Sequence, residues 1–95
     1  MNIVFLPSTR KGLRWFRQYY MSVFAEGKMN ADKQFLAMKR VLVTTPDAGR
    51  PIVGTDCRIS GVPRTPFSVI YRLVDDRVEV MYVYDQRAKS APELT

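Results

Sequence analysis

Residues 67–87 have the sequence FSVIYRLVDDRVEVMYVYDQR, in which two runs of β-branched and aromatic residues flank a short acidic turn. This pattern predicts a β-hairpin. Because side chains alternate between the two faces of a strand, the first strand is expected to place on one face Phe67, Val69, Tyr71 and Leu73. The same alternation predicts a matching face on the second strand made of Val78, Val80, Tyr82 and Tyr84, opposite Glu79, Met81 and Val83. The hairpin is therefore the expected centre of a sheet with one largely buried face.

The residues at the start of the chain predict a strand followed by a helix. Residues 2–6 form a short apolar run that ends at a Pro-Ser-Thr sequence. Either Ser8 or Thr9 can cap the helix that follows, because a hydroxyl at this position satisfies a free backbone N–H. Apolar side chains then recur at helical spacing, which predicts an amphipathic helix from about Thr9 to Ala25.

A second helix and a short strand are expected before the hairpin. Gly27 ends the first helix, Asn30 is the expected N-cap of the second, and its apolar stripe includes Phe35, Met38 and Leu42. Residues 44–51 form a turn-rich loop, and a short strand is expected over residues 56–60. The order β-α-α-β-β-β predicts an α+β fold, with a two-helix hairpin packed on one face of a mainly antiparallel sheet.

Composition restricts the class of protein. Of the 95 residues, 46% are apolar and 25% charged, which is typical of a globular chain, and we expect one domain over residues 1–95. The single cysteine, Cys57, cannot form an internal disulfide, which fits a reducing cytosol. No apolar run approaches the ~20 residues of a transmembrane helix, so we expect a cytoplasmic protein without a membrane partner. The acidic residues show no metal-ligand spacing, and neither a metal nor another cofactor is expected.

Positive charge is concentrated in the first half of the chain. The formal net charge is +6, with nine Lys or Arg and three Asp or Glu in residues 1–50 and six of each in residues 51–95. Arg10, Arg14 and Arg17 form a stripe along the first helix. Such a stripe is often only a soluble helix face. It also suits a phosphate backbone, so a basic nucleic-acid-binding module is one hypothesis for the function.

Several sequence features together resemble the RelE/ParE superfamily, the toxins of bacterial type II toxin–antitoxin modules. These features are a leading strand, two helices, a loop from Pro46 to Gly49 followed by Arg50, and a hairpin that matches Phe-x-Val-Ile-Tyr-Arg-Leu-Val and Val-x-Val-x-x-Val-x-Asp-x-Arg. The resemblance covers nearly the whole chain and is most specific over residues 64–87. It implies an α+β toxin that arrests growth unless its antitoxin partner covers it.

The superfamily implies two kinds of target. Members similar to RelE cut mRNA on the ribosome, whereas members similar to ParE poison DNA gyrase. Cleavage of RNA needs groups that take a proton and stabilise a charged phosphorane, and this chain has no histidine. The resemblance to RelE-like nucleases leaves as catalytic candidates Arg58, Tyr84 and Arg87.

Two roles expected of a nuclease are missing from the aligned positions. Ser68 stands where the resemblance places a strand arginine, and Ser60 where it places a second lysine. The C-terminal tyrosine also has no counterpart, and Tyr84 can replace it only if it shares a groove with Arg58 and Arg87. We therefore favour a gyrase poison over a ribosome-dependent endonuclease.

The resemblance also suggests binding residues. The candidates for target binding are Arg58, Arg64 and Arg87, and those for antitoxin binding are Trp15 and Tyr19. Alternatively, Arg64 and Arg87 form surface ion pairs with Asp85 or Asp56. The aromatic residues, in turn, can belong to the core instead of a binding surface. A third hypothesis is a chain that binds an antitoxin but has no toxic activity.

Overall fold

The computed structural model describes residues 2–23, 27–63 and 65–87. Two helices and five strands follow one another in these ranges. In chain order they are β1 (Asn2–Phe5), α1 (Arg10–Val23), α2 (Gly27–Thr44), β2 (Arg50–Pro51), β3 (Cys57–Gly61), β4 (Phe67–Val74) and β5 (Arg77–Asp85). Short 3-10 turns lie at η1 (Pro7–Thr9) and η2 (Pro46–Ala48). The predicted α+β order is confirmed, and β2 is an addition within the expected loop.

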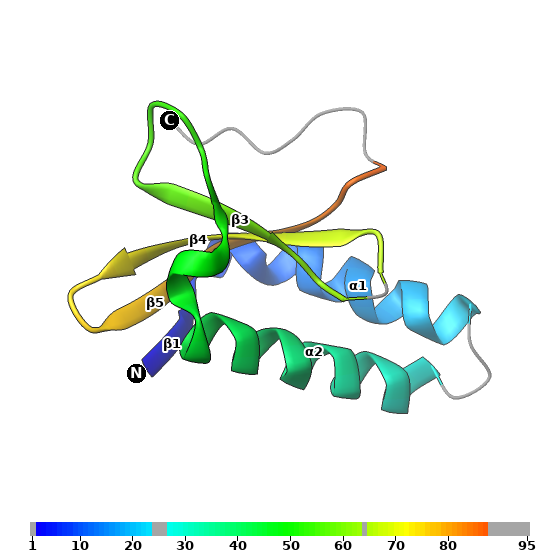
Figure 1. Ribbon diagram of the computed structural model, residues 1–95. Coiled ribbons are helices and arrows are strands. Elements are labelled where there is room, and N and C mark those ends of the chain that lie inside the picture. Colours follow the sequence, from blue (N-terminus) through cyan, green and yellow to red (C-terminus); the bar gives the residue numbers. More distant parts are fainter. Residues whose placement is uncertain (1, 24–26, 64, 88–95) are drawn as a thin grey trace.

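The strands form one sheet in the order β1-β5-β4-β3-β2. The hairpin β4–β5 lies at its centre, as the sequence predicts, and β3 and β2 extend it by antiparallel pairing. β1 pairs with β5 in parallel at the opposite side. Figure 1 shows both helices on one side of this sheet. β1 pairs with residues 77–80 of β5, and on the side of β5 away from β4 the later residues of the strand lie against α1, as Val83 does at Gly12.

A register shift in the hairpin changes one predicted face. Ile70 pairs with Tyr82 but the next residue, Tyr71, pairs with Val80, so Met81 is an extra residue in β5. An extra residue reverses the alternation of side chains beyond it. Val83 therefore faces the core, whereas the prediction that Tyr82 and Tyr84 share a face with Val80 is wrong. The predicted buried face of β4 is confirmed at Phe67, Val69 and Tyr71, which belong to the core. Leu73, near the end of the strand, is instead exposed.

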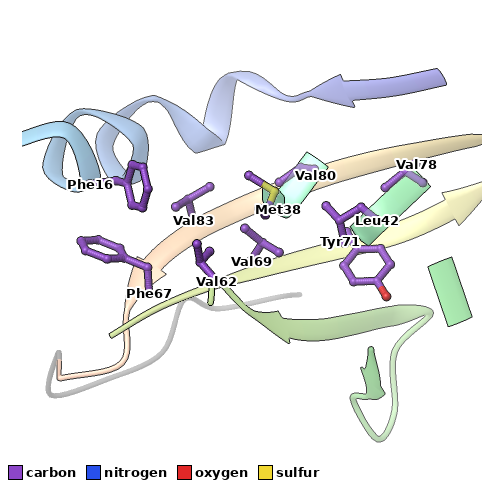
Figure 2. Packing of buried hydrophobic residues seen from close by; sticks show 10 residues of the cluster. All are labelled: Phe16, Met38, Leu42, Val62, Phe67, Val69, Tyr71, Val78, Val80 and Val83. Carbon is purple, nitrogen blue, oxygen red and sulfur yellow. The ribbon is translucent and has the colours of Figure 1, made fainter. Parts of the chain in front are cut away.

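The core lies between the helices and the inner face of the sheet. Its buried members are Phe16, Met38, Leu42, Val62, Phe67, Val69, Tyr71, Val78, Val80 and Val83. Figure 2 shows Phe16 and Phe67 together at one end of this cluster, and Leu42 and Tyr71 together at the other. The rings of Phe16 and Phe67 meet edge to face, with centroids 5.1 Å apart, a favourable arrangement for aromatic pairs.

Two predicted helix signals differ from the structure. α2 begins at Gly27, so Asn30 lies inside the helix and is not its N-cap. Lys28 and Met29 are good helix formers, which allows the helix to begin before Asn30. At the start of α1, the hydroxyl groups of the two predicted caps act as donors to carbonyl groups. Thr9 donates to the Leu6 carbonyl, and Ser8 donates to the Met81 carbonyl, which attaches the start of α1 to the sheet. The predicted end of the first helix at Ala25 lies outside the described residues.

Candidate functional site

Arg87 and Asp85 form an ion pair at the end of β5. The guanidinium donates through Nε to Asp85 Oδ1 at 2.9 Å and through Nη2 to Asp85 Oδ2 at 2.6 Å, and the Arg87 backbone N–H also donates to Oδ1 at 2.9 Å. These hydrogen bonds from Arg87 hold the pKa of the Asp85 carboxyl well below its usual range. The paired arrangement is the one that the sequence offered as the alternative to a target-binding role for Arg87.

Two aromatic residues of α1 complete this cluster. Trp15 donates its indole N–H to Asp85 Oδ2 at 3.1 Å, yet 47% of the residue is exposed. Tyr19, one turn later, packs edge to face on Phe67, and the Arg87 guanidinium lies 5.0 Å from its ring centre. A guanidinium over an aromatic face is favourable. The structure thus brings the predicted antitoxin-binding residues Trp15 and Tyr19 into one cluster with Arg87.

A shallow groove follows α1 on the side that faces β5. It is lined by Lys11, Gly12, Trp15, Val83, Tyr84, Asp85 and Arg87. We call it the α1–β5 groove. Lys11 is exposed at one side, and within the described residues it makes no ion pair. Tyr84 is half-buried on β5, so the groove combines an exposed indole, a phenol and two cationic side chains.

Gly12 allows α1 to approach β5 closely. A Cβ at this position would lie 1.6 Å from the Val83 carbonyl oxygen, so only glycine permits this approach. Lys11 and Gly12 were not among the residues selected from the sequence. A glycine inside an otherwise helical pattern was the available signal, because such a residue often marks close packing.

Arg58 lies at the opposite end of the core, where it holds a loop. Its Nη1 donates to the carbonyl oxygens of Asp47 at 3.1 Å and Gly49 at 2.8 Å. Beside it, the buried Tyr71 hydroxyl donates to Pro46 O at 2.6 Å and accepts from the Gly49 N–H at 3.1 Å. Burial raises the pKa of Tyr71. This network attaches the segment after α2 to the sheet.

The structure does not gather the three nuclease candidates into one site. Arg58 pairs across the strands with Tyr71, and Asp85 pairs with Phe67, four residues earlier in β4. This offset places Arg58 about 13 Å along the strands and two strand spacings, roughly 10 Å, away from Asp85. Tyr84 and Arg87 do share the α1–β5 groove. Arg64, the third target-binding candidate, lies outside the described residues.

A second charged cluster lies on the face of the sheet away from the helices. Glu79 is only 6% exposed and accepts from Arg72 Nε at 2.8 Å and Arg77 Nε at 3.0 Å. The hydrogen bond from Arg72, followed by that from Arg77, lowers the pKa of Glu79. Two guanidinium groups thus share one carboxylate, and the negative charge of Glu79 is fully paired. Cys57 is buried nearby, and burial raises the pKa of its thiol, which disfavours the reactive thiolate.

A cavity of about 220 Å³ lies between the two helices. Its apolar lining is Leu13, Phe16 and Phe35, and its polar lining is Arg17 and Asp32. Arg17 Nη2 and Asp32 Oδ1 lie 3.2 Å apart, and both side chains are largely exposed. Leu36 on α2 is 49% exposed. The helix pair thus presents an apolar depression beside an ion pair.

Two further properties concern metals and membranes. Within residues 2–23, 27–63 and 65–87, no group of three His, Cys, Asp or Glu side chains lies close enough to hold a metal ion. No helix in the same part of the chain has the length and apolar character needed to cross a membrane.

Comparisons with known proteins identify a structural neighbour. No family model matches the sequence, and no curated protein matches it. Among solved structures, a chain from "Chromosomal ParDE TA system from P. aeruginosa" is similar, with a TM-score of 0.66. The similarity covers 87% of this chain and 92% of that chain at 20% sequence identity. It confirms the fold that the resemblance to the RelE/ParE superfamily predicts.

Proposed function

We propose that this protein is the toxin of a type II toxin–antitoxin module, which arrests growth when its antitoxin is absent. The observation that carries the proposal is the shared fold with a chain of a ParDE toxin–antitoxin structure over 87% of this protein. The sequence features of the hairpin, residues 67–87, support it independently. Since one fold can serve several functions, the growth phenotype is the decisive property.

The cognate antitoxin is the proposed partner, and the helix pair supports its binding. An amphipathic antitoxin helix could place a large apolar side chain in the cavity lined by Leu13, Phe16 and Phe35. The exposed Leu36 on α2 and Trp15 on α1 offer further contact area to the same partner, as does Tyr19, whose ring lies next to Arg87. Exposed apolar and aromatic side chains of this kind favour protein contacts because their burial on binding is favourable.

Among the two target classes we favour DNA gyrase over mRNA on the ribosome. The separation of Arg58 from Tyr84 and Arg87 supports this choice, because cleavage needs its groups around one phosphate. Arg58 is also engaged with two backbone carbonyls. Of the proposed target-binding residues Arg58, Arg64 and Arg87, the exposed Arg87 therefore has the strongest support.

Controlled expression of the chain alone tests the toxin proposal. We expect growth to stop within a few generations and to recover when a cognate antitoxin is expressed together with the chain. A map of mRNA 5′ ends shortly after induction separates the two target classes. Intact messages with inhibited gyrase supercoiling in a purified assay would support the gyrase target, whereas new ends in register with codons would identify a nuclease. Normal growth with soluble, folded protein would refute the toxin function.

The substitution Arg87→Gln tests the assignment of the target-binding residue. We expect it to relieve growth arrest while the protein stays folded, because the Arg87 side chain is exposed and Asp85 keeps its hydrogen bonds from Trp15 and from the backbone N–H of residue 87. Arg58→Gln should instead lower the free energy of unfolding by about 1–3 kcal/mol, since it leaves carbonyl groups without their charged donor. Arg40→Gln on the exposed face of α2 is the matched control for loss of one charge. Full toxicity of soluble Arg87→Gln would contradict the assignment.

A further inference from the structure

The α1–β5 groove has cationic side chains on both of its sides. Lys11 lies on α1 and Arg87 follows β5. The lone carboxylate among the lining residues, Asp85, is neutralised by Arg87 and also accepts from Trp15. Arg14 lies three residues from Lys11 on the same helix and is exposed. The charged lining residues, Lys11, Arg87 and Asp85, sum to a formal charge of +1, and the nearby Arg14 adds a second positive charge, so the groove attracts anions.

An exposed aromatic side chain lies among these cations. Trp15 is four residues from Lys11, so both lie on the same face of α1, and 47% of Trp15 is exposed. Its N–H already donates to Asp85, so the exposed part offers π surface instead of a hydrogen-bond donor. Tyr84 lines the groove on the β5 side. Arg87 uses Nε and Nη2 for its side-chain hydrogen bonds to Asp85, so Nη1 is the guanidinium nitrogen that we expect to contact a phosphate.

We infer that the α1–β5 groove binds single-stranded nucleic acid, with a base stacked on Trp15 and phosphates held by Lys11 and Arg87. Sites for single strands combine aromatic platforms with a cationic track in this way, because every base has a π face and every nucleotide a phosphate. A docking site for an acidic peptide is favoured less, because the aliphatic side chain in the lining, Val83, is buried. The inference does not depend on the proposed toxin function.

Fluorescence of the protein itself provides the first test, because Trp15 is the sole tryptophan of the chain. The full-length protein would be titrated with a 12-nucleotide oligo(dT), with an abasic oligomer of equal length and with polyglutamate. We expect quenching by oligo(dT), weaker binding of the abasic oligomer and the weakest binding of polyglutamate. Binding should weaken with salt at a slope of about −0.7 per phosphate contact in a plot of log affinity against log salt concentration.

Variants then locate the binding surface, with anisotropy of a labelled oligo(dT) as the readout. Lys11→Gln should reduce the salt slope by about 0.7 and weaken binding several-fold, because it removes one phosphate contact. Trp15→Leu should weaken binding by roughly tenfold or more, the loss expected when a stacked base loses its platform. Arg40→Gln removes the same charge from α2, outside the groove, and should leave affinity nearly unchanged.

Each contrary result has a definite meaning. Absence of quenching by oligo(dT), or equal binding of the abasic oligomer, would overturn the stacking of a base on Trp15. Equal or tighter binding of polyglutamate would assign the groove to an acidic protein partner instead. An equal loss in Arg40→Gln and Lys11→Gln would show diffuse charge attraction without a site. Circular dichroism of each variant would establish that it is folded, and Lys11→Gln changes only an exposed side chain.

Discussion

The two ends of the core each hold an arginine near the sheet, but the two arginines have different surroundings. At the first end, which we call the Arg58 end, the side chain donates to two loop carbonyls beside the buried Tyr71 hydroxyl. At the other, the Arg87 end, the guanidinium pairs with Asp85 beside an exposed indole and an open groove. Arg58 thus holds backbone carbonyl groups and helps to fix a loop, whereas Arg87 holds a side-chain carboxylate and stays exposed at the edge of the groove.

Substitution of Gly12 gives the largest expected effect and tests how the Arg87 end is built. In Gly12→Ala the new methyl would lie 1.6 Å from the Val83 carbonyl oxygen, so α1 must move away from β5. Although alanine favours a helix by about 1 kcal/mol, we expect a net loss of about 3 kcal/mol or more in the free energy of unfolding. Urea unfolding followed by circular dichroism measures this loss.

Gly61→Ala is the control for the substitution at Gly12. A Cβ at Gly61 has no atom within 4 Å, so we expect a change within about 0.5 kcal/mol. If the two variants were equally stable, the close approach of α1 and β5 would not be what holds the Arg87 end together.

Removal of the Tyr71 hydroxyl tests the Arg58 end. In Tyr71→Phe the buried Gly49 N–H and Pro46 carbonyl lose a partner, so we expect a loss of about 2 kcal/mol in the free energy of unfolding. Tyr84→Phe, at a half-buried position of β5, should change stability by less than about 0.5 kcal/mol. Similar small changes in both variants would mean that the loop is held mainly by Arg58.

Stability against pH gives the smallest effect and separates the two ends. Because hydrogen bonds from Arg87 lower the pKa of folded Asp85, its contribution is present above the ordinary aspartate pKa of about 3.9 and is lost as pH falls below it. Asp85→Asn should therefore flatten the fall of the urea midpoint between about pH 5 and pH 3. Glu79, whose pKa is also lowered, remains in both proteins and supplies the residual slope.

The Arg58 end should respond at the other extreme of pH. Burial raises the pKa of Tyr71, so its contribution is present below the ordinary tyrosine pKa of about 10 and is lost as pH rises through the raised value. Tyr71→Phe should remove this alkaline loss and keep the acid one, and Asp85→Asn should do the reverse. Identical pH profiles in the two variants would show that neither group is linked to folding.

The fold was predictable from the sequence to a large extent, because its signals are local. Alternating apolar residues defined the hairpin, and the helical spacing of Phe35, Met38 and Leu42 marked α2. Errors arose where a local signal competed with neighbouring residues, as at Asn30, which lies inside α2. For the candidate site, the sequence indicated single residues, among them Trp15 and Arg87. It did not indicate that both side chains donate a hydrogen bond to the same carboxylate, that of Asp85.

Local sequence patterns were enough to predict the order of the elements, the central hairpin, the buried face at the start of β4 and the concentration of positive charge in residues 1–50. The extra residue Met81, which turns Val83 inward, could be seen only in the folded protein, and so could the position of Tyr84 in the lining of the α1–β5 groove. The folded protein also shows that Arg58 holds a loop whereas Arg87 borders a groove. Helical and strand periodicity depend on neighbours along the chain and can therefore be read from the sequence. Strand register and side-chain partners depend on residues far apart in sequence, which meet only in the folded protein.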